Sequence, residues 1–200
     1  MPSGSRIEKE EIIKTAFFIV REKGIEGVNA REIAKRLNCS VQPIFYRFKN
    51  MEELKQELLE YAKDYYKIYL LNMNEKGPKY RQIGMNYIRF AKEETNVYKF
   101  IFMGNYKIKI EKFAFFDKSY TEVEKTLQVQ NDISREMAKK FHLKMWLFVH
   151  GISCLIATNT CCFTDEEIKL LLAEEFQILR KSLNNHSDID IEFIEKDGVD

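Results

Sequence analysis

Apolar residues recur every three to four positions along most of this chain, a spacing typical of helices that bury one face. The first such stripe runs from Ile12 to Val20, and Gly24 behind it is of the kind that commonly ends a helix. Further helices are predicted over residues 30–37, 41–47, 52–71, 79–93, 95–103 and 120–129, and two long helices follow from Ser134 and Thr164. The pattern therefore predicts an all-α fold.

Residues that cap helices stand at the predicted helix starts. Two pairs have the spacing of a capping box, in which each side chain satisfies a backbone N–H group near the other: Asn29 with Glu32, and Thr164 with Glu167. Single N-caps are predicted at Ser40, Thr95 and Ser134. The stretch 107–116 alternates isoleucine and lysine as a strand would, but a lone strand has no partner. A loop or a short helix is expected there.

The most specific pattern lies between Asn29 and Leu54. Two short helices are joined by a tight turn at Asn38-Cys39, and a longer helix follows closely behind them. Pro43 falls in the first turn of the second short helix, where a missing N–H group costs little. This is the pattern of a helix-turn-helix, whose second helix enters the major groove of DNA.

Few residues of so short a recognition helix can reach bases. Gln42 can form a bidentate bond with adenine, and Val41 and Pro43 can touch thymine methyl groups. The start of the preceding helix can offer backbone N–H groups to a phosphate, at Asn29, Ala30 and Arg31. For Arg31, an ordinary surface charge is an equally good interpretation.

The sequence resembles the TetR family of bacterial transcription regulators. Residues 31–40 are similar to the family's second helix and turn, residues 41–48 to its recognition helix, and residues 51–54 to the start of its fourth helix. Trp146 with His150-Gly151 resembles a shorter signature in the regulatory domain of one subset of the family. The resemblance implies an all-helical homodimer with three DNA-binding helices, a linking fourth helix, and a ligand-sensing, dimerising domain.

Two positions depart from the family's pattern. Phe45 stands where the family usually has a tyrosine that meets a phosphate, and Met51 stands where it usually has a lysine. Neighbouring groups could supply the missing hydroxyl and charge: Tyr46, Arg47, Lys49 and Lys55. Together with Ser40 and Phe45, these residues complete the predicted DNA-binding set.

The resulting division of the chain has four parts. Residues 1–50 are predicted to form the helix-turn-helix DNA-binding domain, and residues 51–76 the linking fourth helix. Residues 77–184, opened by Gly77-Pro78, are predicted to form the regulatory and dimerisation domain. Residues 185–200 are expected to be an acidic, flexible tail.

Charge and composition sharpen this division. The 200 residues are 45% hydrophobic and carry a formal net charge of +1, so the protein can bury a core but is not a basic coat for nucleic acid. The first fifty residues hold ten Lys and Arg residues against six Glu, whereas the stretch from Asn184 holds six acids against one Lys. A positive head suits local phosphate contacts, although solvated helix faces would carry the same charges.

Other features exclude several classes of protein. The chain has no apolar run of about eighteen residues and no apolar signal region at its start, so neither a membrane span nor secretion is expected. Its four cysteines lack the spacing of a CxxC pair or a zinc site, so reduced thiols and a cytoplasmic location are expected: Cys39, Cys154, Cys161 and Cys162. A redox or soft-metal role for the adjacent Cys161 and Cys162 is the less favoured alternative.

The second half of the chain is rich in aromatic residues, which suits a small-molecule pocket. The predicted lining is Tyr87, Phe90, Phe100, Met103, Phe113, Phe116, Tyr120, Met145, Trp146 and His150. An ordinary helical core would have the same composition. Apolar stripes on the last two helices predict a two-fold dimer face made of Cys154, Ile168, Leu172, Phe176 and Leu179, with packing inside the monomer as the alternative.

No glycine-rich phosphate loop, HExxH motif or GxSxG motif occurs, so the sequence supports neither an enzyme nor a cofactor. The favoured interpretation is a ligand-responsive regulator, most simply a repressor that a small, largely apolar effector releases from its operator. Its expected partners are double-stranded DNA, a second copy of the chain and that effector. The alternative is a helical ligand-binding or protein-interaction module without sequence-specific DNA binding.

Overall fold

The computed structural model describes residues 7–73, 77–104, 120–131 and 133–184, and within these ranges all regular structure is helical. The elements are α1 (Lys9–Lys23), the 3-10 turn η1 (Ile25–Gly27), α2 (Ala30–Arg36), α3 (Gln42–Arg47), α4 (Met51–Leu70), α5 (Lys79–Glu93), α6 (Thr95–Phe102), α8 (Tyr120–Asn131), α9 (Arg135–Ala157) and α10 (Asp165–Asn184). The all-α prediction is confirmed. The stretch 107–116 and the acidic tail lie outside the described residues.

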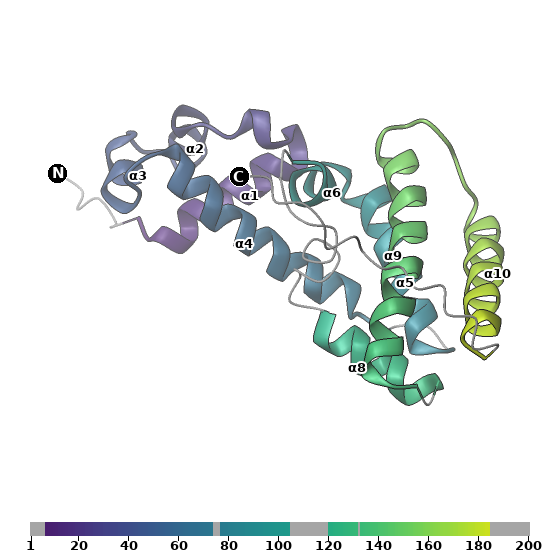
Figure 1. Cartoon of the computed structure of the whole chain (residues 1–200). Coiled ribbons are helices and arrows are strands. Elements are labelled where there is room, and N and C mark those ends of the chain that lie inside the picture. The colour runs from purple at the N-terminus through teal and green to yellow at the C-terminus, as the bar shows by residue number, and fades with distance from the viewer. Residues whose placement is uncertain (1–6, 74–76, 105–119, 132, 185–200) are drawn as a thin grey trace, which may run out of the picture.

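Figure 1 shows how the helices are arranged. The short helices α2 and α3 gather with α1 at one end of the molecule, and α4 runs from them toward the middle. At the other end, α5 packs against α9 and also contacts α4, α6, α8 and α10. None of the described helices combines the length and apolarity of a membrane span.

Helix α4 contributes to the core at both ends of the molecule. Near its start, Leu54 and Leu58 are fully buried in the cluster that includes residues of α1, α2 and α3. Near its end, the Tyr66 ring lies 5.2 Å from the rings of Phe90 in α5 and Phe102 in α6. The division of the chain at residues 50 and 77 therefore stays a prediction, because one continuous core runs past both positions.

Several predicted caps are confirmed. Asn29 Oδ1 accepts the Glu32 N–H at 2.9 Å, and Ser134 Oγ accepts the N–H three residues further on at 3.2 Å. Thr164 and Glu167 form both halves of their box, with bonds of 2.7 and 3.2 Å. These bonds satisfy donors that the first turn of each helix leaves free.

Two predicted caps are wrong. Val41 precedes α3 without a capping side-chain bond, and Ser40 is exposed one residue earlier. The Thr95 hydroxyl donates to the Ala91 carbonyl at 2.9 Å, in the last turn of α5, and so does not cap α6. The residue at the N-cap position of α6 is Glu94. A hydroxyl can bond to the turn before it as readily as to the turn after it, and sequence spacing does not distinguish the two.

A buried carboxylate joins the two ends of the molecule. Glu94, at the junction of α5 and α6, accepts two hydrogen bonds from the Arg21 guanidinium of α1 and one of 2.9 Å from the Tyr65 hydroxyl of α4. Asn96 donates to the Arg21 carbonyl at 3.0 Å. The bond to Glu94 is the main cause of a raised pKa of Arg21. The junction therefore holds α1 and α4 against the end of α5.

Candidate DNA interface and second-domain cavity

Helix α3 packs against the protein on one side and is exposed to solvent on the other. Ile44 and Phe48 are buried, so the opposite face of the helix points outward. On that face Gln42 is exposed, Phe45 is 49% exposed and Tyr46 is 85% exposed. Two large aromatic side chains left in water beside a polar amide make a surface that gains free energy when a partner covers it.

The turn before α3 fixes its direction. In the predicted turn, Asn38 adopts a left-handed conformation (φ 50°), and the Cys39 N–H donates to the Ala34 carbonyl at 3.0 Å. Behind α3, Asn50 caps α4 by accepting the Glu53 N–H at 2.9 Å. This cap was not predicted, although Asn50 precedes Glu53 by three residues, the same spacing as Asn29 and Glu32.

The predicted phosphate-contacting residues divide into two kinds. Arg47 is bound inside the protein, since its guanidinium donates to Glu8 at 2.9 Å and to the Ile7 carbonyl at 3.2 Å. Arg47 in this structure therefore ties α3 to the start of α1, and its contact with DNA stays a prediction. Arg31 and Lys49 are exposed and Lys55 is half-buried, and none of these three has an ion-pair partner among the described residues.

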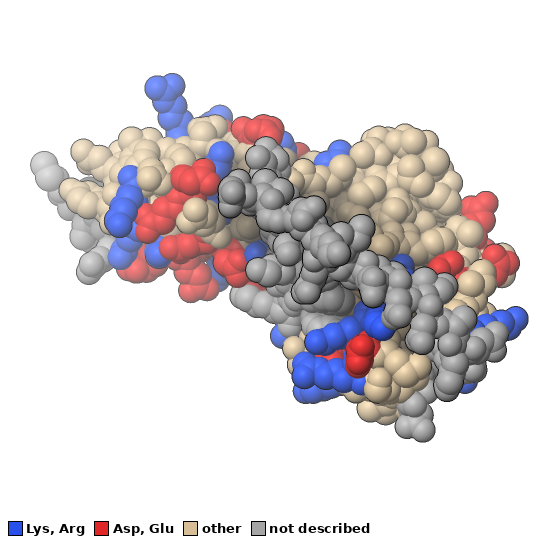
Figure 2. All heavy atoms as spheres, in the orientation of Figure 1, with Lys and Arg blue, Asp and Glu red and all other residues tan. Residues whose placement is uncertain are grey.

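Other cations of the N-terminal helices are paired with acidic side chains. Glu32 pairs with Lys23 at 2.9 Å and with Arg36 at 3.2 Å, and Glu22 also binds Arg36. In Figure 2, blue and red side chains are interspersed over the N-terminal helices on the visible face. The positive head predicted from the charge count is therefore a small set of unpaired cations around α2, α3 and the start of α4. It is not a continuous basic patch on this face.

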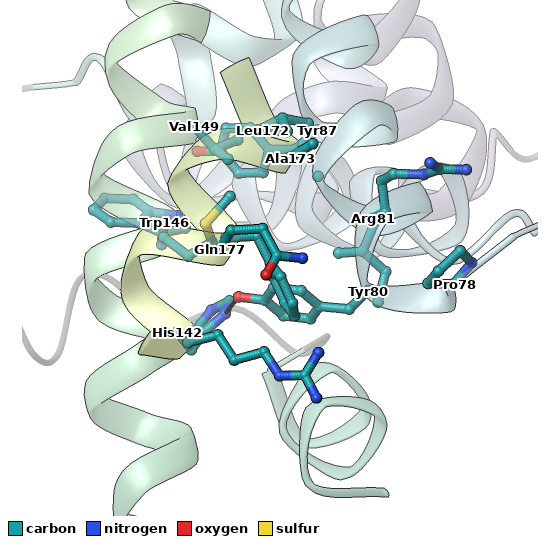
Figure 3. Close-up of a pocket in the computed structure, with 15 residues that line it drawn as sticks. Pro78, Tyr80, Arg81, Tyr87, His142, Trp146, Val149, Leu172, Ala173 and Gln177 are labelled. Atoms are coloured by element: carbon teal, nitrogen blue, oxygen red, sulfur yellow. Dashed lines mark hydrogen bonds between the residues drawn. The ribbon is translucent and has the colours of Figure 1, made fainter. Parts of the chain in front are cut away.

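A cavity of about 440 Å³ lies between α5, α9 and α10 in the second domain. Figure 3 shows Tyr80 and Tyr87 from α5, His142 and Trp146 from α9, and Gln177 from α10 around it. The lining also includes Pro78, Arg81, Ile83, Gly84, Met145, Val149, Leu172, Ala173, Phe176 and Arg180. Its size and largely apolar wall are those of a small-molecule site.

The predicted pocket is correct only in part. Tyr87, Met145 and Trp146 line the cavity. The other described members of the predicted set do not, and this is a correction: Phe90 is buried in the core, Phe100 is half-buried, Met103 is exposed, and His150 lies behind Trp146. Phe113, Phe116 and the Tyr120 side chain lie outside the described residues.

The missed lining residues had a signal in the sequence. Tyr80, Ile83, Gly84 and Tyr87 are spaced as one face of α5, and His142, Met145, Trp146 and Val149 as one face of α9. Aromatic density alone selected Phe90 instead, which packs against Tyr66 and Tyr69 of α4. The helical phase of a residue, rather than its size, decides which side of α5 it occupies.

Two half-buried histidines lie at the cavity, His142 in its lining and His150 next to it. His150 stacks on Trp146 with ring centroids 4.6 Å apart, and the hydroxyls of Tyr87 and Tyr98 each lie 2.9 Å from its Nδ1. His142 Nδ1 lies 3.1 Å from the Tyr80 hydroxyl. Burial lowers the pKa of both histidines to about 4, so both rings are neutral at pH 7.

The predicted dimer face is largely interior to one chain. Ile168, Leu172 and Leu179 of α10 are buried, and Leu172 and Phe176 line the cavity, so this face of α10 turns toward α5 and α9. This is a correction in favour of the alternative, packing inside the monomer. Cys154 is half-buried and lies 3.5 Å from His150 Nε2.

The opposite face of the last two helices carries apolar residues in water. Leu147 and Leu155 are exposed on α9, and Leu170 and Ile178 are 63% and 61% exposed on α10. Gly151 lies between the two α9 leucines, and a Cβ added to it would meet nothing within 4 Å. The described part of the monomer therefore gives no packing reason for a glycine at this position.

All four cysteines are free thiols, and no cluster of three His, Cys, Asp or Glu side chains within the described ranges could hold a metal ion. The arrangement is that of a two-part helical protein, with a helix-turn-helix at one end and a cavity in the bundle at the other. Comparisons with known proteins place it more closely.

Residues 12–58 match the family described as bacterial regulatory proteins, tetR family. The tetracycline repressor protein class C of Escherichia coli is 30% identical over 56 residues, a stretch that spans 28% of this chain and 26% of the repressor. Both similarities are confined to the helix-turn-helix part of the chain, and this chain matches about a quarter of the repressor's length.

Solved structures extend the similarity to the whole fold. A transcriptional regulator from Rhodococcus sp. RHA1 aligns with a TM-score of 0.59 at 15% identity, covering 88% of this chain and 97% of the regulator. A Vibrio parahaemolyticus protein named for the TetR family aligns with a TM-score of 0.58 at 12% identity, covering 85% and 97%. The chain therefore has the fold of these structures.

Proposed function

We propose that this protein is a DNA-binding transcription regulator, most simply a repressor, which acts as a homodimer in the cytoplasm and responds to a small effector. The observation that supports the proposal is the exposed face of α3. The helix is anchored by buried Ile44 and Phe48 and presents Gln42, Phe45 and Tyr46 to solvent, in a segment that matches the TetR family. An exposed edge of this kind is the part of a helix-turn-helix that enters the major groove.

The proposed phosphate contacts follow from charges that nothing else neutralises. Arg31, Lys49 and Lys55 have no carboxylate partner in the described parts of the chain, whereas Arg36 and Arg47 are paired. A cation with a carboxylate already bound must give up that partner to reach a phosphate. The unpaired three are therefore the better candidates for backbone contacts, which fix register rather than sequence.

Dimerisation is proposed through the exposed faces of α9 and α10. Leu147, Leu155, Leu170 and Ile178 would be covered by the same residues of a second copy, as in an isologous interface. Gly151, which has no neighbour in the monomer, would allow the two copies of α9 to approach closely. The dimer would hold two recognition helices about one DNA turn, roughly 34 Å, apart.

The Gly151→Arg variant tests the proposed dimer interface. The monomer has room for the new side chain, so the variant should fold as the wild type does but should remain monomeric in light scattering. Thr121→Arg, at an exposed position of α8 and off the proposed face, is the matched control. A wild-type protein that is monomeric at micromolar concentration would contradict the proposed interface.

The effector response is proposed to travel through α5. One face of α5 lines the cavity at Tyr80 and Tyr87, while Asn86 on another face donates to the Leu70 and Asn72 carbonyls at the end of α4 at 3.1 and 2.9 Å. At its last turn, Glu94 holds Arg21 of α1. A ligand that shifts α5 would therefore move α4 and α1 together, and the response requires that it bind the two arrangements with different affinity.

DNA binding itself is tested by selecting an operator from random duplexes and measuring its affinity by fluorescence anisotropy at several salt concentrations. A regulator should prefer the selected site strongly over random DNA, and its affinity should fall with salt. The second candidate is a ligand-binding module without sequence-specific DNA binding. It is favoured by Phe45 and Met51, which lack the hydroxyl and the charge usual at these positions, and equal affinity for all duplexes would support it.

A further inference from the structure

The described arginines differ in whether they have a carboxylate partner. Five of the eight have a carboxylate partner: Arg21, Arg36, Arg47, Arg89 and Arg135. Arg31, at the proposed DNA surface, has none among the described residues. The other two without such a partner are Arg81 of α5 and Arg180 of α10, and both line the cavity.

The described lining of the cavity offers no negative group to balance these two charges. Among the described residues that line it, none is Asp or Glu. One terminal nitrogen of the Arg81 guanidinium lies 2.7 Å from where a Gly77 Cβ would stand, and in Figure 3 the guanidinium points away from Tyr80, His142 and Trp146, toward the edge of the cavity. Arg180 follows Phe176 and Gln177 by one turn of α10, on the face that lines the cavity.

The interior of the cavity is different in character. Its wall is formed by aliphatic and aromatic side chains such as Met145, Trp146 and Phe176. His142 is neutral at pH 7, because burial lowers its pKa to about 4, and its ring faces the Tyr80 hydroxyl. An apolar interior with two cations at its boundary suits a molecule with an apolar body and one negative end.

We propose that the cavity binds an apolar carboxylate, with its hydrocarbon body between Trp146, Met145 and Phe176 and its head group held by Arg81 and Arg180. Guanidinium groups match a carboxylate with paired N–H donors, and side chains without another partner give up no existing ion pair to do so. The proposal rests on the proposed effector response, whose ligand it names by chemical class.

The protein contains its own reporter for this test. Trp146 is the only tryptophan in the chain, and it lines the cavity, so its fluorescence reports binding at this site. Decanoate, decanamide and decylamine are transparent probes with the same body and a negative, neutral or positive head. Decanoate should bind at least about tenfold more tightly than either of the others, and its preference should shrink as salt is raised.

Arg81→Gln and Arg180→Gln each remove one charge from a position that has no ion pair among the described residues. Each should weaken decanoate binding about tenfold, and the double variant should bind decanoate and decanamide equally. Lys181→Gln is the matched control, since it removes the same charge from the neighbouring residue of α10, which does not line the cavity. It should leave all three affinities unchanged.

Three results would overturn the assignment: equal affinity for the three probes, no fluorescence response to any of them, or decanoate affinity that survives the double variant. Operator affinity measured with each probe separates this proposal from the proposed function. Decanoate binding that depends on both arginines but leaves operator affinity unchanged would support the ligand class and reject the effector role. If decanamide released the operator as strongly as decanoate does, the effector role would be supported and the carboxylate class would be rejected.

Discussion

The N-terminal helices and the second domain differ in where they keep their polar groups. Around α1, α2 and α3 the buried residues are apolar, and polar side chains lie at the surface. The buried polar residues of the described ranges all lie beyond α4: Gln82, Asn86, Glu94, Glu124 and Ser153. The two histidines of low pKa are there as well.

This difference bears on function. An apolar core of buried Ile, Leu and Phe has one good packing and holds α3 at a fixed angle, which suits the recognition of DNA. Buried polar groups need specific partners, and an arrangement that satisfies them in one geometry can be replaced by another when a ligand supplies or removes a partner. This contrast agrees with the proposal that the helices beyond α4 bind the effector.

The largest effect is expected where the two parts share a core. Tyr66→Ala removes a buried ring that contacts α5 and α6, and should lower the free energy of unfolding by about 3–5 kcal/mol. Ile68→Ala, two residues further along α4 at a position that is 73% exposed, should change it by less than about 0.5 kcal/mol. Denaturant unfolding measures both, and similar values would mean that α4 does not join the two parts.

Acid should weaken the second domain first. Residues 7–73 contain no histidine, whereas His142 and His150 are half-buried, with pKa values of about 4. Unfolded histidines titrate near pH 6.5, so between about pH 6.5 and 4 the unfolded chain binds more protons than the folded one. Stability is therefore fully present above pH 6.5 and falls toward pH 4, by up to about 3 kcal/mol per histidine.

Unfolding curves at several pH values in this range measure the effect. In His142→Gln, the part of the slope that belongs to this residue should disappear, because glutamine does not titrate. Signals from the two parts of the molecule, such as Trp146 fluorescence for the second domain, should show which part responds. A stability that is flat down to pH 4 would mean that the histidines are not buried as neutral groups in solution.

Recognition of the base sequence should depend on α3 alone. Gln42→Ala should cost about 1–3 kcal/mol at one base position of a selected operator, if Gln42 forms a bidentate contact there. Lys49→Ala should weaken binding to all sequences alike and flatten the salt dependence. Gln128→Ala, on α8 in the second domain, is the control and should leave operator affinity unchanged. Anisotropy titrations that show no difference between these variants would remove α3 from the interface.

The smallest effect concerns the cavity wall. In Gly84→Ala the new Cβ would lie 3.5 Å from Leu172 and 3.9 Å from Val149, which is ordinary contact. Alanine should stabilise α5 by about 0.5–1 kcal/mol, because glycine loses more backbone freedom on folding. Gly151→Ala should stabilise α9 similarly, but only Gly84→Ala narrows the cavity. Thermal unfolding tests the sign, and a destabilised Gly84→Ala would show that α5 and α10 lie closer than described.

Sequence alone determined the helices, the helix-turn-helix and several of its details. Asn29, Ser134 and Thr164 cap their helices as predicted, and Asn38 turns the chain in a left-handed conformation. These features depend on residues within one turn of each other, so local spacing contains the information. Ser40 and Thr95 failed because a hydroxyl has backbone partners on both sides.

Tertiary structure decided what each apolar face meets. The stripe Ile168, Leu172 and Leu179 shows that one face of α10 is buried, but only packing shows that α5 and α9 of the same chain bury it. The same holds for charge. Arg47 and Arg180 look alike in the sequence, yet one is bound to Glu8 and the other lines a cavity without an ion pair among the described residues. Periodicity records that a side chain is covered, whereas its partner is set by contacts between residues far apart in the chain.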